Sequence, residues 1–252
     1  MKPKLILIDG DLFAYKYAAA GEQEWDWGDG IYSLHSDVAS AWKNMKADID
    51  VCAAQLGADK IVVCLSDSRS FRKEQVYADY KSNRKGVRKP LGLKEMKHRM
   101  TDAYEVRVKP LLEADDVMGI IATNPHIYPE FDKVICSRDK DMKSIPAVIW
   151  NEKLDDKGKP ILEYVDEATA NYRHLVQTLS GDPADGYPGC KGIGPVKAAV
   201  IAKEGWEGVA AAFEKSGQGL DFALTMARCA RILRATDFDY TKQEPKLWIP
   251  SA

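Results

Sequence analysis

The sequence predicts an α/β fold, with a doubly wound and mainly parallel sheet followed by a helical C-terminal region. Short apolar runs typical of buried parallel strands alternate with stretches of helical period over the first two thirds of the chain. From about residue 166 onward mainly helical patterns remain, with glycines between them. We therefore expect the sheet in residues 1–165 and a helical subdomain in residues 166–252.

Local patterns place the elements in order. The apolar run 5–8 predicts a buried strand and 12–20 the helix after it, while 21–30 predicts a loop that carries two tryptophans. Apolar residues at helical spacing predict a helix over 37–56, which Gly57 is suited to end. Further elements are expected as strands at 60–65, 106–108, 133–137 and 148–150, a helix at 114–122, a hairpin or loop at 153–161, and a helix at 168–179.

The charge distribution is more informative than the total. The 252 residues carry a formal net charge of −2, yet residues 69–109 hold thirteen Lys or Arg against five Asp or Glu. Hydrophobic residues at 45% suffice for a large core. This asymmetry indicates a basic segment beside an acidic region.

Cysteine and histidine usage excludes several classes of site. The five cysteines are scattered without a C-x-x-C pair, which predicts reduced thiols in a cytoplasmic protein. The four histidines lack the spacing of a zinc site. Only four apolar residues precede Asp9, too few for a signal peptide, and no apolar stretch predicts a membrane span.

Acidic residues recur where the predicted strands end. Carboxyl ends of parallel strands meet at one edge of a sheet, so these acids are expected to converge. Two carboxylates about 4 Å apart repel by about 4 kcal/mol, and an all-oxygen cluster therefore favours Mg²⁺ or Mn²⁺. The predicted metal ligands are Asp9, Asp67, Glu113, Asp115, Asp116, Asp139, Asp141, Asp182 and Asp185.

Each acid alone could instead cap a helix. The patterns E-x-D-D, D-x-D and D-x-x-D supply more acids than caps require. On a helix Glu113 and Asp116 would share a face, and on an extended strand end Asp139 and Asp141 would project to the same side. With acids for two ions the chemistry indicated is phosphoryl transfer, in which one metal activates water and both stabilise charge.

The basic segment interleaves aromatic and cationic residues. Its sequence FRKEQVYADYKSNRKGVRKP has the composition that grips single-stranded or frayed nucleic acid, although a solvated loop remains open for the distal charges Lys94, Lys97 and Arg99. We expect Lys81 and Arg84 to act in catalysis by neutralising the scissile phosphate. Predicted nucleic-acid contacts are Arg72, Tyr80, Lys85, Arg88 and Lys89.

A glycine-rich hairpin, GCKGIGPVKAA, begins at Gly189. Gly192 and Gly194 permit a tight turn whose N–H groups, with those of the next helix, can face a phosphate. Lys191 and Lys197 add positive charge. Alone G-x-G could be only a turn; as a helix-hairpin-helix it predicts a salt-sensitive DNA grip.

The ordered set IDGD, Asp67, YKSNRK, LEADD, SRDKD, GDPADG and GCKGIG resembles the 5′-nuclease (flap endonuclease) superfamily, whose core is similar to PIN domains. It is similar in particular to the stand-alone 5′-to-3′ exonucleases of short-tailed bacteriophages. The resemblance implies a PIN-like fold and hydrolysis with two Mg²⁺ (or Mn²⁺) at 5′ ends, nicks, gaps or short flaps of DNA, and on RNA in RNA–DNA hybrids. It also implies phage DNA replication or host DNA degradation, a monomer in the host cytoplasm, and admits K⁺ at the glycine hairpin.

The resemblance assigns roles to residues. Asp9, Asp67, Glu113 and Asp115 would serve one metal, Asp141, Asp182 and Asp185 the other, and Asp139 would lie between, while Asp11 supports the site. Tyr80 would stack on the terminal base and the Lys81–Arg84 pair would lie at the base of an arch. This arch, at about 69–109, is short and interrupted by Pro90 and Gly92, which favours exonuclease action over flap cleavage.

Two other functions stay open at this point. A PIN-type ribonuclease shares the acid-rich sheet without requiring the glycine hairpin. A non-catalytic DNA-junction binder would keep the scaffold alone. Trp25 and Trp27 could serve as a wedge against a bent duplex, or as anchors in the core or in their loop.

Overall fold

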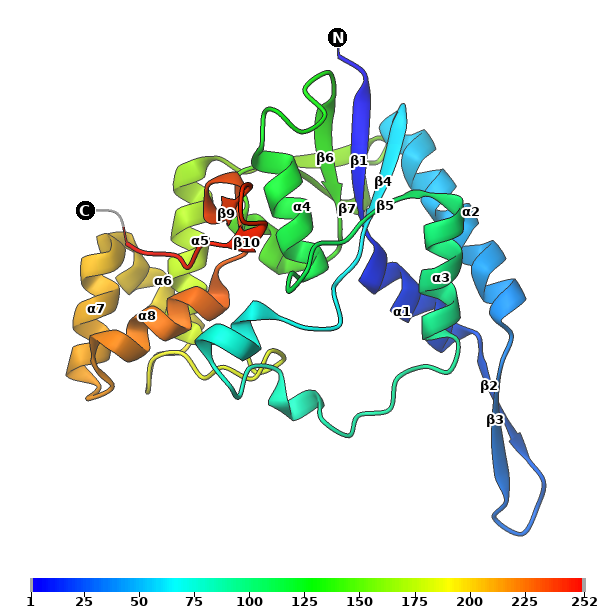
Figure 1. Cartoon of the computed structure of the whole chain (residues 1–252), viewed down its shortest axis with the longest axis horizontal. Helices are drawn as coiled ribbons and strands as arrows, with labels where there is room; N and C mark the ends of the chain where they lie inside the picture. The colour runs from blue at the N-terminus through cyan, green and yellow to red at the C-terminus, as the bar shows by residue number, and fades with distance from the viewer. Residues whose placement is uncertain (1, 251–252) are drawn as a thin grey trace.

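The computed structural model describes residues 2–250 and is built on one six-stranded sheet (Figure 1). The strand order is β5-β4-β1-β6-β7-β8. The first five are parallel to one another, and β8 is antiparallel to β7. The strands are β1 (Lys4–Asp9), β4 (Lys60–Cys64), β5 (Glu105–Arg107), β6 (Asp132–Cys136), β7 (Val148–Leu154) and β8 (Pro160–Tyr164). The mainly parallel α/β prediction is confirmed.

Helices cover both faces of the sheet because the strands are apolar on both sides. Ile6 and Ile8 point toward α1 (Gly10–Ala20), α2 (Val38–Leu56) and α3 (Leu93–Ala103). Leu5 and Leu7 point to the other face, in the cluster that contains α4 (Ala114–Thr123). Buried apolar area on both faces is the main stabilising contribution to this arrangement.

The second part consists of α5 (Glu167–Ser180), α6 (Pro195–Ile201), α7 (Gly205–Lys215) and α8 (Gly219–Ala230). These helices pack around their own cluster, which includes Leu179, Phe213 and Met226. The chain then returns to the sheet, because Leu233 and Phe238 lie in the core beside α4. This return includes three short elements, η5 (Ala235–Asp237), β9 (Phe238–Asp239) and β10 (Glu244–Pro245).

Two local predictions were wrong. Residues 21–30 do not form a simple loop, since β2 (Glu22–Asp26) pairs with β3 (Tyr32–Ser36) in a hairpin that projects from the body (Figure 1). Trp25 and Trp27 on it are 55% and 67% exposed, so neither anchors a core. Helix α3 inside the basic segment was not expected, and it begins just after Pro90 and Gly92.

Smaller differences concern element ends. Strand β5 begins one residue earlier than predicted, and β7 extends four residues further as one arm of the hairpin with β8. All five cysteines are buried and free. Among residues 2–250, none of the helices combines the length and apolarity needed to cross a bilayer.

Candidate active site

Acids gather at the carboxyl edge of the sheet. Asp9 ends β1, is only 5% exposed, and accepts hydrogen bonds from the Leu12 N–H and the Ser137 hydroxyl, both at 3.0 Å. Burial raises the pKa of Asp9 to about 6, and the charges of Asp11 and Asp139 add to the effect. Asp9 therefore holds its negative charge at a cost in free energy.

Asp115, in the first turn of α4, carries the clearest uncompensated charge. Burial and the nearby charges of Asp9 and Asp139 raise its pKa well above the usual value. Across the described part of the chain it has no salt bridge or side-chain hydrogen bond. A carboxylate in this condition is stabilised by a bound cation.

Asp139 links this group to a second one, made of Asp141 and Asp182. Asp141 accepts a hydrogen bond from Gln177 Nε2 at 2.8 Å. Burial raises its pKa to about 6, together with the charges of Asp139 and Asp182. Nothing in the sequence marked Gln177, one polar residue on an amphipathic helix. The structure thus joins acids from the sheet with acids after α5.

The predicted catalytic cations lie against the remaining acids. Lys81 forms an ion pair with Glu113 Oε2 and its Nζ lies 3.6 Å from Asp185 Oδ1. Arg84 Nη2 donates to the same Asp185 oxygen at 2.7 Å. Burial alone would raise the pKa of Glu113, but the charges of Lys81 and Arg72 outweigh it and lower that pKa. Glu113 and Asp185 are therefore already neutralised.

The GDPADG turn is fixed by glycine backbone. Gly181 and Gly189 have φ of +67° and +68° and lie against each other. An added Cβ would come within 2.4 Å of Pro188 at the first glycine and 2.3 Å of Gly181 at the second. Only glycine fits both positions, and this close approach holds the intervening Asp182 and Asp185 beside the sheet.

Asp67 has a different environment. Its Oδ1 accepts the Ser68 N–H at 2.6 Å and its Oδ2 accepts the Leu111 N–H at 2.8 Å. The bond from Leu111 is the main reason why its pKa is lowered. Asp67 thus fixes the loop that leads into Glu113, and its role as a metal ligand stays a prediction.

Asp116 and Arg72 were assigned incorrectly. Both Asp116 oxygens accept guanidinium N–H groups of Arg72 at 2.7 Å. The N–H groups of Glu113 and Leu233 fill its remaining acceptor sites at 3.2 and 3.0 Å. Both side chains are buried, at 0% and 3% exposure. Neither a metal nor DNA can reach them, because Glu113 caps α4 and Asp116 turns back into the protein to complete the capping box.

Two further expectations fail on geometry. Tyr80 is 2% exposed, stacks on Tyr187 with centroids 6.2 Å apart and donates to Asp185 at 2.8 Å, so no base can stack on it in this conformation. Asp139 and Asp141 do not lie on an extended strand end. Asp139 caps the short helix η3 (Lys140–Ser144) by accepting the Asp141 N–H at 2.8 Å.

The other predicted nucleic-acid residues lie on the surface. Arg88 forms a two-pronged ion pair with Glu22, at 2.6 and 2.8 Å, which ties the basic segment to the projecting hairpin. Gly192 has φ of +78° with open space around it, as the predicted turn requires. Exposed positions are Lys85, Lys89, Lys191, Gly192, Gly194 and Lys197. Of the distal charges, Lys97 pairs with Asp11.

Within residues 2–250, no three His, Cys, Asp or Glu side chains converge closely enough to form a ready-made ion site. The donor set nevertheless fits a divalent cation. Its members are all carboxylates, and mutual repulsion and burial raise the pKa of Asp9, Asp115 and Asp141. A divalent cation held by these carboxylates would offset that cost.

Comparison with known proteins shows the family of the chain. Residues 4–163 match the model of the 5′-3′ exonuclease N-terminal, resolvase-like domain. The chain belongs to the 5′-3′ exonuclease family. The exodeoxyribonuclease of Enterobacteria phage T3 is 31% identical over 98% of this chain and 93% of its own length. The exonuclease of Escherichia phage T7 is 30% identical over the same shares. The flap endonuclease Xni of Shewanella baltica is 27% identical over 79% of this chain and 74% of its own.

Solved structures share the fold of this family member. A bacteriophage T5 protein crystallised with metal ions aligns with a TM-score of 0.65 and 14% identity, covering 92% of this chain and 90% of that one. The T5 flap endonuclease in a pseudo-enzyme–product complex with DNA and metal ions aligns with a TM-score of 0.66 over the same shares. The resemblance inferred from the acid motifs is confirmed.

Proposed function

We propose that this protein is a divalent-metal-dependent 5′-to-3′ exonuclease that hydrolyses phosphodiester bonds at 5′ ends and nicks of DNA. One observation carries the proposal: Asp115 holds a repelled, unpaired charge between Asp9 and Asp139, at the strand ends where parallel sheets place their ligands. The name of the T3 relative, an exodeoxyribonuclease, and the DNA bound in the T5 complex support DNA as the substrate.

Two ions are proposed to share the acids. Asp9, Asp115 and Asp139 hold the first, and Asp141 and Asp182 hold the second with Asp139 between them. Glu113, Asp185 and Asp67 act directly or through water. Mg²⁺ at such a site lowers the pKa of a bound water and offsets the charge that builds on the phosphate.

Lys81 and Arg84 are proposed to receive the scissile phosphate. Lys81 Nζ lies between the carboxylates of Glu113 and Asp185. A phosphate oxygen that enters the site can take the place of one of these carboxylates as the partner of the lysine. Its φ of +54° is unusual for lysine and is maintained by a bond of 2.7 Å from its N–H to the Asp185 carbonyl. This backbone arrangement keeps the cation beside the acids before substrate binds.

The exposed cations of the basic segment and of the glycine hairpin are proposed to grip the DNA backbone. Lys85 and Lys89 serve the frayed 5′ strand, and Lys191 and Lys197 serve the duplex at a helix-hairpin-helix, with K⁺ as the cation that the turn would accept. Backbone contacts of this kind do not read sequence. The RNA strand of an RNA–DNA hybrid is therefore proposed as a second substrate. The protein is also proposed to act as a monomer.

The decisive experiment compares Asp139, which lies beyond the carboxyl end of β6, with Asp132 at the start of that strand. Asp139→Asn should abolish cleavage of a 5′-labelled nicked duplex in Mg²⁺ while DNA binding persists, and EDTA should stop the wild type. The matched control is Asp132→Asn, since this exposed acid begins the same strand at the far edge of the sheet. Wild-type turnover by Asp139→Asn, or cleavage in EDTA, would remove the assignment. Cleavage of single-stranded RNA is measured in parallel, because a PIN-type ribonuclease would cut that substrate.

A further inference from the structure

A cavity of about 580 Å³ lies between α5, α7 and the last described residues, 246–250. It opens on the early turns of α5, at Glu167, Asn171 and His174. The later turn of the same helix carries Gln177, which contacts Asp141. The cavity is thus separate from the acid edge, although one helix borders both.

Positive charge predominates in its lining. Arg231, Arg234 and Lys246 face two acids, Glu167 and Asp237. Arg231 is paired with Asp237 at 2.8 Å, and Arg234 Nη1 with Glu167 at 2.8 Å. Lys246 has no ion pair among the described residues. The lining therefore holds one more cation than acids.

Arg234 itself is incompletely satisfied. Its side chain is almost fully buried, at 3% exposure, and its Nε has no hydrogen-bond partner in the described structure. Burial lowers its pKa to about 10, and the charge of Arg231 adds to the effect. Arg234 Nη1 and Nη2 donate to Glu167, Asn171 and the Ser144 carbonyl, so the guanidinium is held in place while its charge stays costly. An anion bound in the adjoining cavity would lower that cost.

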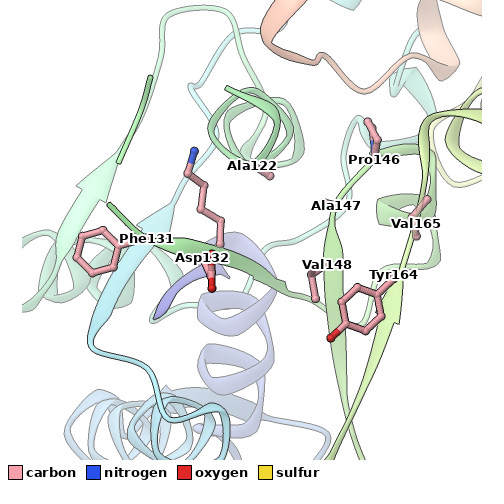
Figure 2. A pocket seen from close by; sticks show the side chains of 9 residues that line it. Ala122, Phe131, Asp132, Pro146, Ala147, Val148, Tyr164 and Val165 are labelled. Carbon is pink, nitrogen blue, oxygen red and sulfur yellow. The ribbon is translucent and has the colours of Figure 1, made fainter. Parts of the chain in front are cut away.

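A second pocket lacks the unpaired buried donor that Arg234 provides beside the first cavity. A pocket of about 360 Å³ lies at the start of β6 and β7. Figure 2 shows its lining, which includes Asp132, Val148 and Tyr164. Its one cation, Lys133, donates to the carbonyls of Ile121 and Asn124. Among residues 2–250, none of the buried unfilled donors belongs to the lining of this pocket.

The larger cavity also has an aromatic wall. Trp206 and Trp248 pack edge to face, with centroids 5.2 Å apart and planes at 68°. His174 lies against Trp248 in the same manner, at 4.9 Å. Indole faces are surfaces on which flat rings stack. The lining therefore combines a place for a ring with a place for an anion.

We propose that this cavity binds a nucleoside 5′-monophosphate, with the base against Trp206 or Trp248 and the phosphate near Arg234 and Lys246. Its volume falls within the range of small-molecule sites. The choice of a nucleotide among aromatic anions rests on the proposed function, because an exonuclease releases such molecules. The occupant is either the free nucleotide or the phosphorylated 5′ end of a strand.

The test is calorimetric titration of the full chain with dAMP in EDTA, where no metal recruits the phosphate to the acid edge. Lys246→Glu should weaken binding by about tenfold or more, because it reverses a charge next to the phosphate. The control is Lys242→Glu, an exposed lysine of the same terminal segment outside the cavity. It should bind dAMP as the wild type does.

Further ligands separate the contributions. Deoxyadenosine and inorganic phosphate should each bind at least about tenfold more weakly than dAMP, since each lacks half of the recognised chemistry. A 5′-phosphorylated tetranucleotide that binds like dAMP identifies a strand end, and one that binds much more weakly identifies the free nucleotide. Undiminished binding by Lys246→Glu, or equal binding of deoxyadenosine, overturns the site. Titration of Asp139→Asn keeps this result independent of whether the protein cleaves DNA.

Discussion

Two neighbouring carboxylates of the LEADD motif lie in opposite electrostatic regions. Asp115 faces the acid edge, where Asp9 and Asp139 repel it and the attraction of Lys81 does not offset that repulsion. Asp116, the next residue, is enclosed by Arg72 and receives four N–H groups. The unbalanced charge of Asp115 is suited to bind a ligand, whereas the balanced charge of Asp116 stabilises the fold.

The balanced region holds the two parts of the molecule together. Arg72 comes from the basic segment, Asp116 from α4, and Arg72 Nε also donates to the Cys229 carbonyl of α8 at 3.0 Å. This junction therefore connects the sheet to the helical part.

The largest expected effect is on the unbalanced side. Asp115→Asn should lower the turnover of a nicked duplex by about a thousandfold or more, because it removes a charge needed to hold the metal. The free energy of unfolding should not fall, since the change also removes repulsion with Asp9 and Asp139. Urea unfolding and a cleavage time course on the same preparation measure both. A variant that unfolds more easily would mean that Asp115 is a structural acid.

Asp116→Asn should show the reverse. Breaking a buried pair leaves Arg72 uncompensated and should cost about 3–5 kcal/mol of unfolding free energy. The folded fraction should still cleave DNA in Mg²⁺ at low temperature. The double variant Arg72→Met with Asp116→Leu serves as the control, because it removes both charges and should recover much of the loss. Equal instability of the single and double variants would contradict an electrostatic junction.

A smaller effect is expected from the buried His174 of α5. Burial lowers its pKa to about 3, the charges of Arg231 and Arg234 add to this, and its Nε2 lies 2.8 Å from the Ala227 carbonyl. Since the folded pKa is below that of the unfolded chain, stability is complete above about pH 6.5 and falls as pH decreases toward 3, by about 2 kcal/mol at pH 5.

The control for that prediction is the His174→Gln variant, whose free energy of unfolding is measured at each pH. The raised pKa values of Asp9 and Asp141 act in the opposite direction over the same range, because protonation relieves their repulsion. The difference between wild type and variant removes this shared background. A difference that does not change between pH 7 and pH 5 would show that His174 is not held neutral.

Most of the sheet and the acid edge could be predicted from the sequence, and the reason is local. Buried parallel strands are continuous apolar runs, and Asp9 ends one such run while Asp139 lies three residues after another. The hairpin β2–β3 could not be recognised, since its exposed residues include Trp25 and Trp27 and follow no hydrophobic period.

The errors among site residues have a different origin. Arg72 and Tyr80 lie in a segment whose composition indicates an exposed DNA grip. Their burial depends on partners far along the chain, namely Cys229 for Arg72 and Asp185 for Tyr80. Asp116 carries the same ambiguity, because its motif does not reveal which acid meets an arginine. Tertiary contacts decide each case.

The finest distinction is between cations of one basic segment. Arg72 is buried and paired, whereas Lys85 is exposed and has no ion pair in the described structure. Lys85→Ala should weaken binding of a nicked duplex only several-fold and reduce the slope of log affinity against log salt by about one, the value for one lost phosphate contact. The free energy of unfolding should be unchanged, since an exposed lysine contributes little to stability.

Fluorescence anisotropy across a salt series in EDTA measures the slope. The paired control is Arg72→Met, which should lose stability with little change in slope for the folded protein. An unchanged slope for Lys85→Ala would place the DNA elsewhere on the surface.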